Sequence, residues 1–299
     1  MLPSLGCQGA RIVARDTGRT VLLQGVNVSG MEYSDTPLAG VTPDELTTIV
    51  RGWGANVVRI PFTQSLVMQG RNGDDYVAEL QELVSWLAEL GAYSILDLQW
   101  LDREKVWGPG DNRVPPAPNE ESADCWAKLA AVFAGHPGVI FDLLNEPHDI
   151  GAAEWNEWAL RLAGAIRTVD PARVLMVSGV NWAFDLRGVE LQLPDVIYST
   201  HVYPWMSQNW WTHFGHRAGE APLFAGEFGG GPEDLAWGRK LLAYMRELGM
   251  GWTAWSWRDK PHLQNQGIPT VFGDLVLEAL HRNPPVSGPL TSGPGGISL

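Results

Sequence analysis

Eight apolar, β-rich runs alternate with helical patterns between residues 21 and 257 of the chain. The runs cover residues 21–30, 56–62, 93–100, 139–147, 173–179, 196–204, 222–229 and 251–257. Their near-continuous apolar character is typical of strands that are covered on both faces, as in a parallel sheet. Eight strands joined by crossovers close more naturally into a barrel than into an open sheet. We therefore expect an α/β fold with the topology of a (β/α)8 TIM barrel.

The segments between these runs carry recognisable helix signals. Thr42 and Glu45 match a capping box, with Pro43 at the first helical position. Gly91 ends an amphipathic segment, which is where a helix C-terminus favours glycine. Further helices are expected at about residues 74–90, 119–134, 152–168, 232–248 and 274–281, whereas residues 185–193 carry only a weak helix signal.

Length and composition limit the number of domains. A chain of 299 residues accommodates one barrel of about 250 residues. The sequence shows no internal repeat and no domain boundary, so we predict a single catalytic domain over residues 1–283. Residues 284–299 are rich in Pro, Gly and Ser, which predicts a flexible tail.

The charge of the chain narrows the classes of partner. The formal net charge is −13, which argues against nucleic acid and anionic membranes, because both bind basic surfaces. No run approaches the ~18 apolar residues of a membrane-spanning helix, and the N-terminal segment shows no signal peptide. We expect a monomer acting on a neutral substrate, and the cellular location stays open.

Polar and aromatic side chains stand at the ends of six of the apolar runs. In a β/α barrel the carboxyl ends of all strands meet on one face, where functional side chains gather. A lone buried polar residue is often structural, but matching positions on several strands favour a shared site. The residues are Arg59, Gln99, Asn145, Glu146, His201, Tyr203, Glu227 and Trp255.

The residue types predict glycoside hydrolysis with retention of anomeric configuration. Glu146 would be the general acid/base, with a raised pKa, and Glu227 the nucleophile, which must be ionised. Arg59 and Tyr203 can donate to Glu227, which holds it in place and lowers its pKa. Asn145 can donate to the sugar 2-hydroxyl. Retention predicts a carboxyl separation of about 5–5.5 Å.

Other side chains at the same face would bind sugar. His201 can hydrogen-bond Glu146 or the substrate, and Trp255 offers a flat platform for the ring that is cleaved. The chain has 15 Trp, of which half or more are expected to be structural. Among Trp205, Trp210 and Trp211, which follow the sixth run, one is expected to extend the cleft.

The set formed by Arg59, Asn145-Glu146-Pro147, His201-Val202-Tyr203, Glu227 and Trp255 resembles glycoside hydrolase family 5 of clan A. The resemblance covers residues 21–282 in the expected strand order. It implies a double displacement that needs no metal and no organic cofactor, and it favours secretion. It also implies that Lys260 contacts a sugar on the non-reducing side and that Trp182 stacks on leaving-group sugars.

The position after the third run departs from the family pattern. The family usually has a histidine there, in Asp-x-His, whereas this sequence reads Asp97-Leu98-Gln99. Glutamine can hydrogen-bond a sugar hydroxyl but carries no charge. Gln99 is therefore kept as a substrate-binding position, and we expect the sugar preference or the pH profile to differ.

Two other classes of protein remain as alternatives. A metal-dependent hydrolase would need several histidines at matched depth, often as His-x-His, and the run ends show no such pair. A carbohydrate-binding barrel without catalysis would need a substitution that abolishes the reaction, and Gln99 is the candidate for such a substitution. We predict a cellulase-like endoglucanase that cleaves internal β-1,4 bonds of cellulose or related β-glucans. A β-mannanase or another β-glycanase of the same family is the nearest alternative.

Overall fold

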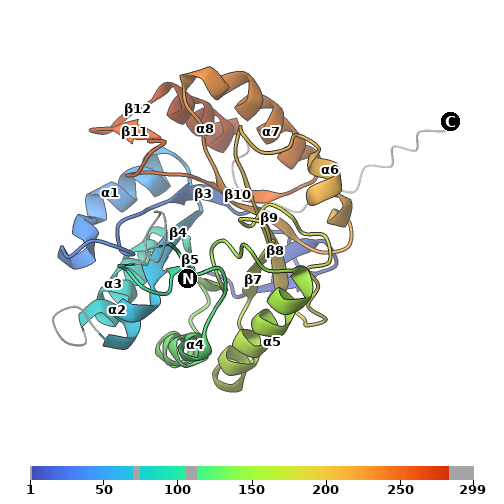
Figure 1. Cartoon of the computed structure of the whole chain (residues 1–299). Helices are drawn as coiled ribbons and strands as arrows, with labels where there is room; N and C mark the ends of the chain where they lie inside the picture. The colour runs from blue at the N-terminus through green and yellow to red at the C-terminus, as the bar shows by residue number, and fades with distance from the viewer. Residues whose placement is uncertain (1, 70–74, 105–112, 283–299) are drawn as a thin grey trace.

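The computed structural model describes residues 2–69, 75–104 and 113–282, within which eight parallel strands form a closed barrel (Figure 1). The expected (β/α)8 TIM-barrel topology is confirmed. β10 closes the ring by pairing with both β9 and β3. The predicted tail, residues 284–299, lies outside the described residues. In order around the barrel the strands are β3 (Gln24–Asn27), β4 (Val57–Thr63), β5 (Tyr93–Trp100), β6 (Val139–Asp142), β7 (Leu175–Ser178), β8 (Val196–Val202), β9 (Leu223–Phe228) and β10 (Gly251–Ala254).

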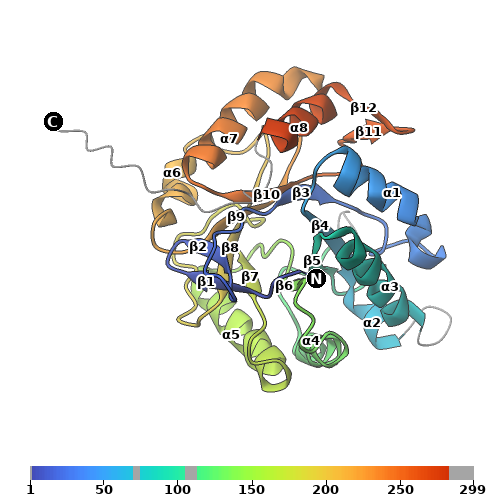
Figure 2. The same ribbon diagram turned by 180° about the vertical axis from the view of Figure 1, so that it is seen from behind.

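An antiparallel hairpin packs at the amino-terminal end of the barrel. It consists of β1 (Leu5–Gln8) and β2 (Arg11–Ala14), and Figure 2 shows it on the side of the barrel seen from behind. Leu5 and Ile12 join a buried apolar cluster with residues at the start of several barrel strands, such as Val57. The sequence did not predict this hairpin, because two four-residue strands give too short a pattern.

Helices cover the outside of the barrel, and several of them begin at signals that the sequence carries. The Thr42 hydroxyl accepts a hydrogen bond from the Glu45 backbone N–H (3.2 Å), and Asn119 and Ser122 form a reciprocal capping box. Pro232 opens a 3-10 turn directly before α7. The helices are α1 (Pro43–Thr47, continued by a π-helical turn over Thr48–Gly52), α2 (Gln64–Gln69), α3 (Asp75–Leu90), α4 (Glu120–Val132), α5 (Ala152–Val169), α6 (Trp210–His213), α7 (Leu235–Glu247) and α8 (Val271–Arg282).

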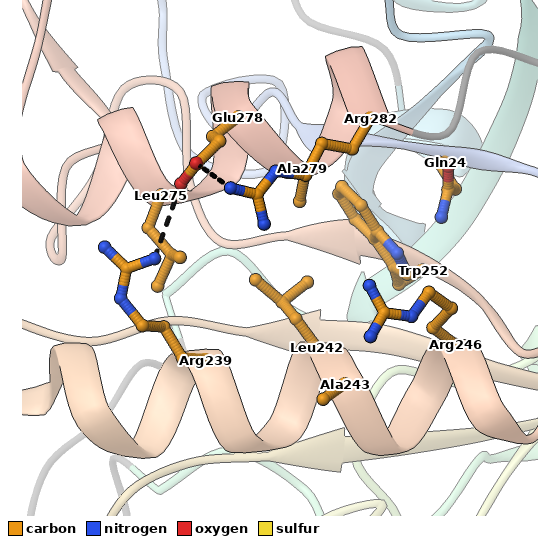
Figure 3. Close-up of a pocket in the computed structure, with 10 residues that line it drawn as sticks. All are labelled: Gln24, Arg239, Leu242, Ala243, Arg246, Trp252, Leu275, Glu278, Ala279 and Arg282. Atoms are coloured by element: carbon orange, nitrogen blue, oxygen red, sulfur yellow. Dashed lines mark hydrogen bonds and ion pairs between the residues drawn. The ribbon is translucent and has the colours of Figure 1, made fainter.

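A pocket of about 250 Å³ lies where α7 and α8 pack over β10 (Figure 3). Its most prominent polar group is Glu278, which pairs with both Arg239 and Arg282. Leu242, Leu275 and two alanines form much of the remaining wall. The pocket therefore lies on the outside of the barrel, away from the carboxyl ends of the strands.

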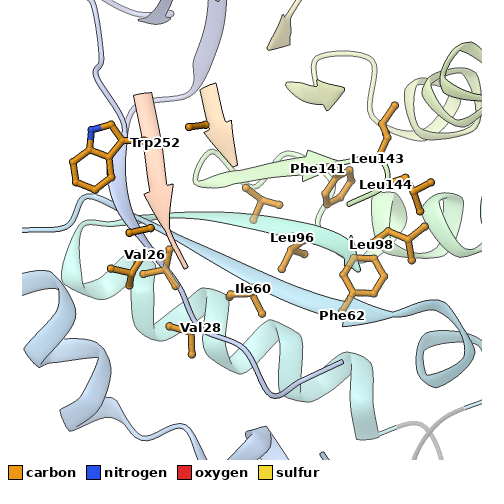
Figure 4. Packing of buried hydrophobic residues seen from close by; sticks show 14 of the residues in the cluster. Val26, Val28, Ile60, Phe62, Leu96, Leu98, Phe141, Leu143, Leu144 and Trp252 are labelled. Carbon is orange, nitrogen blue, oxygen red and sulfur yellow. The ribbon is translucent and has the colours of Figure 1, made fainter. Parts of the chain in front are cut away.

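Alternation along each strand sorts side chains into two layers. Along β5, Leu96 and Leu98 belong to the outer core between strands and helices, which Figure 4 shows with its neighbours. Ile95 belongs instead to the inner cluster at the amino-terminal end. Asp97 and Gln99 continue this inward row toward the carboxyl end, because successive strand residues point to opposite faces. The strand pattern thus delivers polar side chains to one end of the barrel interior.

Three strands end at least three residues earlier than the apolar runs predict, and one of them is β3, which stops at Asn27 rather than near residue 30. β6 stops at Asp142 rather than near residue 147, and β10 stops at Ala254 rather than near residue 257. Beyond β6 the backbone N–H of Leu143 bonds to β7, whereas that of Asn145 bonds to β5, so the ladder to either neighbour breaks. Glu146 therefore lies in a loop just beyond the strand.

Some small elements were not predicted from the sequence. They are α2, α6 and a two-stranded hairpin formed by β11 (Gln264–Asn265) and β12 (Ile268–Pro269). Residues 185–193, which carry a weak helix signal, form turns and loops instead. Within the described parts of the chain, every helix is too short or too polar to cross a bilayer.

Candidate active site

A cleft of about 1000 Å³ opens at the carboxyl ends of the barrel strands. Glu146 and Glu227 both line it, and most of the other predicted site residues line it with them, namely Gln99, Trp182, Tyr203, Trp255 and Lys260. The remaining three, Arg59, Asn145 and His201, are buried. Arg59 contacts Glu227 and His201 contacts Glu146, and Asn145 accepts a hydrogen bond from Arg59. The structure therefore brings all of the predicted site residues together.

Arg59 lies at the centre of the polar floor beneath the cleft. Its guanidinium donates to Asp142 at 3.1 Å and to Glu227 Oε1 at 2.9 Å, and it lies 2.9 Å from Asp97. All four side chains are almost completely shielded from solvent. Although burial lowers the pKa of Arg59, these carboxyl groups raise it above its usual value, so the guanidinium stays charged. One cation thus organises three acidic groups.

Glu227 reaches the cleft because β9 carries an extra residue. Thr200 of β8 pairs with Ala225, but His201 pairs with Glu227, so Gly226 is a bulge. Without the bulge, strict alternation would turn Glu227 away from the inner face that His201 occupies. A Cβ on Gly226 would lie 2.8 Å from Nε2 of His201, which explains why a glycine precedes the glutamate.

Two donors hold the Glu227 carboxylate. Arg59 donates to Oε1 at 2.9 Å, and the Tyr203 hydroxyl donates to Oε2 at 2.8 Å. Burial raises the pKa of Glu227, whereas Arg59 and Tyr203 lower it. The lowering by Arg59 and Tyr203, which the sequence predicted, is confirmed, but burial has the larger effect, so the pKa of Glu227 is raised overall. Burial and the neighbouring carboxylates also raise the pKa of Tyr203, so the phenol keeps the proton that it donates.

Glu146 has a different environment from that of Glu227. Its Oε1 lies 2.9 Å from Nδ1 of His201, whose own pKa is lowered well below the usual range by burial and by Arg59. Burial, followed by the charge of Glu227, raises the pKa of Glu146 well above its usual value. Glu227 alone has a guanidinium and a phenol as donors, so Glu146 is the member of the pair that keeps a proton.

The two carboxyl groups lie close together. One oxygen of Glu146, one oxygen of Glu227 and one ring nitrogen of His201 lie within 4.8 Å of one another. Such proximity fits the separation of about 5–5.5 Å in retaining glycosidases better than the 6.5–9.5 Å of inverting ones. The same three residues could offer ligands to a metal. However, Arg59 and Tyr203 already donate to both oxygens of Glu227, and one His with two Glu differs from the His₃, His₂Glu and Cys₂His sets of catalytic zinc.

Two amide side chains complete the polar floor. Arg59 donates to Oδ1 of Asn145 at 2.9 Å and to Oδ1 of Asn27 at 3.0 Å. With its oxygen occupied, Asn145 has its amide N–H groups left to donate to a sugar hydroxyl. Asn27 instead donates to backbone carbonyls, including that of Gly226, and so has a structural role.

Gln99 lies at the wall of the cleft, beside Trp100 and Glu146. The residue is buried, and its side-chain oxygen accepts no hydrogen bond from the residues that the structure describes. Buried polar atoms are normally satisfied, so a sugar hydroxyl is a fitting partner for this oxygen. The position of Gln99 is consistent with substrate binding, which stays a prediction.

Loops after β7 and β10 supply the other predicted contacts. Trp255 follows β10 and donates its indole N–H to the backbone carbonyl of Lys260 at 3.1 Å. Trp182 follows β7, and its ring stacks on His148 with centroids 3.6 Å apart and planes 7° apart. Nδ1 of His148 lies 2.8 Å from the backbone carbonyl of Glu146. Trp182 is therefore tied to the segment that carries the predicted acid/base.

Glu32 is a residue of the cleft that the sequence did not predict. It is buried, and its Oε2 accepts a hydrogen bond from the Gly30 N–H at 2.7 Å. Burial raises its pKa to about 8, although backbone hydrogen bonds oppose this shift. Glu32 lies just past the end of the first apolar run. A polar side chain at the end of a strand was therefore the sequence signal by which it could have been predicted.

A closed parallel barrel with two close carboxyl groups at its carboxyl end is typical of retaining β/α-barrel glycosidases. The family model described as cellulase (glycosyl hydrolase family 5) matches residues 15–261, which include every predicted site residue. The chain belongs to this family.

Several curated proteins are similar to this chain in sequence. Endoglucanase N of Pectobacterium atrosepticum is 25% identical over 282 residues, which cover 86% of this chain and 57% of that protein. Endoglucanase 5 of Pectobacterium carotovorum is 24% identical, over 86% of this chain and 50% of that protein. An endoglucanase of Paenibacillus polymyxa is 26% identical, over 83% and 78%. The chain thus spans about half the length of the first two relatives.

Solved structures show the same fold. A β-glucanase from Saccharophagus degradans, crystallised with cellotetraose, has a TM-score of 0.82 at 22% identity, over 95% of this chain and 94% of that chain. The catalytic domain of the major endoglucanase from Xanthomonas campestris has a TM-score of 0.75 at 24% identity, over 92% and 99%.

Proposed function

We propose that this protein is a retaining endo-β-1,4-glucanase that cleaves internal bonds of cellulose or of a related β-glucan. The observation that carries the proposal is the pair Glu146 and Glu227, which share one cleft but have unlike environments. The names of the relatives, all endoglucanases, and the cellotetraose bound by a structural neighbour support a β-glucan substrate.

The first step forms a glycosyl-enzyme. Glu146 gives its proton to the glycosidic oxygen while a Glu227 oxygen attacks the anomeric carbon, so the bond to the leaving sugar breaks as the bond to Glu227 forms. Arg59 and Tyr203 hold the Glu227 carboxylate for this attack. Asn145 would donate to the 2-hydroxyl, a contact that strengthens in the transition state.

The second step returns both carboxyl groups to their starting states. Once Glu227 is esterified, its negative charge is gone, and that charge is one of the causes that raise the pKa of Glu146. The pKa of Glu146 then falls, which suits its new role as the base that takes a proton from water. The resulting hydroxide equivalent attacks the anomeric carbon and releases Glu227.

Substrate would lie along the cleft between aromatic platforms. Trp255 would support the sugar ring that is cleaved, and Lys260 would contact a sugar on the non-reducing side. Trp182 would stack on the first leaving-group sugar, and Gln99 would accept a hydrogen bond from a hydroxyl group. Each of these side chains lines the cleft, which gives the assignments their support.

Product release from a panel of polysaccharides tests the proposal. The panel comprises carboxymethyl cellulose, barley β-glucan, glucomannan, galactomannan, xylan and xyloglucan, with an aryl β-cellobioside as an activated substrate. We expect reducing sugar from the glucans. Release from mannans alone would keep the mechanism and make the protein a β-mannanase. If no product is released from any substrate, the proposal is contradicted and a carbohydrate-binding barrel without catalysis is favoured.

Glu227→Gln tests the nucleophile separately. We expect turnover to fall about 10⁴-fold or more, because removal of a covalent nucleophile has effects of this size. The nearly isosteric change should leave the fold and sugar binding intact. Glu220→Gln, at an exposed glutamate, is the matched control and should keep full activity. For the wild type, NMR should show the β-anomer as the first product, whereas the α-anomer would indicate inversion.

Independence of metals and the monomeric state are further parts of the proposal. Activity should be unchanged after exhaustive chelation, since both steps use only the carboxyl groups of Glu146 and Glu227. Loss of activity with EDTA, restored by a divalent ion, would contradict this. Size-exclusion chromatography with light scattering should give the mass of one chain.

A further inference from the structure

His201 contacts the predicted acid/base through one of its ring nitrogens, and the other nitrogen faces away from it. Nδ1 lies 2.9 Å from Oε1 of Glu146 and 3.6 Å from Oε2 of Glu227. Nε2 is buried and makes no hydrogen bond to any residue that the structure describes. Buried polar atoms are normally paired, so the surroundings of Nε2 indicate what holds this side of the ring.

The hydroxyl group of Ser199 is a second buried polar group of this kind. Ser199 is completely buried, and its Oγ likewise has no hydrogen-bond partner within the described parts of the chain. Ser199 and His201 lie two positions apart on β8, so their side chains point to the same inward face of the barrel. A hydroxyl group and a ring nitrogen are suitable hydrogen-bond partners for each other.

Gly226 of β9 lies against both of these atoms. A Cβ on Gly226 would lie 2.7 Å from Oγ of Ser199 and 2.8 Å from Nε2 of His201. The two polar atoms therefore border the same small space, and the glycine at the bulge keeps any side chain out of it. A rotation of the Ser199 side chain, or one bridging water, would satisfy both atoms at once.

The charged groups around His201 favour a proton on Nδ1. Glu146, from the loop after β6, and Glu227, from β9, both face Nδ1. Burial, followed by the guanidinium of Arg59 on β4, lowers the pKa of His201 well below its usual value, so the imidazole is neutral. Tyr203, on the same strand as His201, donates its hydroxyl hydrogen to Glu227. A neutral imidazole that carries its proton on Nδ1 has an acceptor at Nε2, which then needs a donor.

We propose that Ser199 is a positioning residue for the acid/base: its hydroxyl group donates to Nε2 of His201, directly or through one buried water, so that Nδ1–H donates to Oε1 of Glu146. The inference rests on the function proposed above. With Oε1 held by the ring, the carboxyl proton of Glu146 lies on Oε2, from which it passes to the leaving oxygen. Without a donor at Nε2, the other tautomer would turn an acceptor nitrogen toward Glu146 and withhold that proton from the substrate.

Nitrogen NMR of the free wild-type protein tests the tautomer directly. In a sample with 15N-labelled histidine, Nδ1 of His201 should carry the proton and Nε2 should not, and the two kinds of nitrogen differ in chemical shift. His201→Gln identifies the resonances among those of the seven histidines. Ser199→Ala should change the Nε2 shift most, because that nitrogen loses its donor. A proton on Nε2 in the wild type would overturn the proposal.

Leaving groups of different basicity test the effect on Glu146. Ser199→Ala should lower kcat/KM about five- to tenfold on phenyl β-cellobioside, whose leaving oxygen needs a proton. The loss should be less than about twofold on 2,4-dinitrophenyl β-cellobioside, whose leaving group departs without one. The basic limb of the pH profile should move to higher pH by about 0.5–1 unit, because an acceptor at Nδ1 raises the pKa of Glu146. Ser199→Thr keeps the hydroxyl group and should restore both properties.

Thr200→Val is the matched control for the loss of a buried hydroxyl group. The Thr200 hydroxyl donates to the backbone carbonyl of Phe184 at 3.1 Å, on the opposite face of β8 from Ser199. This variant should keep the leaving-group dependence and the pH profile of the wild type. Equal losses on both cellobiosides in Ser199→Ala, with an unchanged basic limb, would show a purely structural role and overturn the proposal. If the wild type cleaves no glycoside, the proposed function fails, whereas the nitrogen spectra still decide the tautomer of His201 and the role of Ser199.

Discussion

The two ends of the barrel interior bury side chains of opposite character. At the amino-terminal end, Val57 of β4 and Ile95 of β5 join an apolar cluster under the β1–β2 hairpin. Two residues further along the same strands, Arg59 and Asp97 belong to a buried network of charges. The same strands therefore form both the apolar and the charged environment, which lie only two residues apart along each strand.

The difference separates stability from chemistry. Burial of apolar side chains stabilises the fold, whereas burial of charges costs desolvation energy that close pairing only offsets. The stability of the barrel depends on the apolar end, and the proposed reaction depends on the charged end. A variant at the apolar end should thus affect unfolding, and one at the polar end should affect both unfolding and turnover.

Arg59→Met should have the largest effect on the free energy of unfolding. It removes the cation from among Asp97, Asp142 and Glu227, and breaking a buried ion pair costs about 3–5 kcal/mol. Turnover should also fall about 10²–10³-fold, since Glu227 loses a fixed donor. Urea unfolding and initial rates measure the two effects. Arg15→Met removes a partly exposed ion pair with Asp195 and should cost at most about 1 kcal/mol. Similar losses of unfolding free energy and of turnover in both variants would contradict the central role assigned to Arg59.

Met176→Ala probes the apolar end. Met176 is fully buried in the inner cluster, so the substitution should cost about 2–5 kcal/mol of unfolding free energy. At temperatures where the variant is folded, kcat should change less than about twofold, because the Met176 side chain belongs to the apolar cluster and not to the charged network. Leu160→Ala, at an exposed leucine, should stay within about 0.5 kcal/mol of wild type. A large fall in kcat for Met176→Ala would show that the two ends are coupled.

Glu32→Gln tests the pH dependence of stability at the polar end. Burial raises the pKa of Glu32 from 4.5 to about 8, so between these values the folded protein holds a proton that the unfolded chain has released. Stability that is present below pH 4.5 is therefore lost as the pH rises through 8. The urea midpoint of the wild type should fall from pH 5 to pH 8 more steeply than that of Glu32→Gln. The control Glu190→Gln, at an exposed position, should keep the wild-type slope. Parallel slopes in all three proteins would contradict the raised pKa.

Gln99→His should have the smallest effect. The substitution restores the side chain usual in the family, and we expect kcat/KM to change about two- to tenfold, as for one hydrogen bond. The change should be greatest below about pH 6.5, where histidine gains a charge. Gln99→Leu, which cannot hydrogen-bond, is the contrast and should weaken substrate binding at every pH. Identical pH profiles for wild type and Gln99→His would show that charge at this position is unimportant.

Much of the polar end could be predicted from the sequence, because its signals are periodic. Arg59 and Gln99 stand at the ends of apolar runs, and the parallel barrel brings such ends to one face. The loop position of Glu146 was less predictable, since β6 ends at Asp142, where backbone hydrogen bonds switch between neighbouring strands. The lowering of the Glu227 pKa by Arg59 and Tyr203 could be predicted, whereas the larger, opposite effect of burial could not, because a sequence shows the donors but not the extent of burial.

The sequence by itself determined the (β/α)8 barrel and membership of the glycosidase family, because both follow from strand number, strand order and short motifs. Only the tertiary structure decided which way Glu227 points, because that depends on the bulge at Gly226. Only the tertiary structure placed Glu32 in the cleft and separated Trp205 from Trp210 and Trp211. These positions depend on loop paths and on packing between distant segments, and neither leaves a periodic pattern in the sequence.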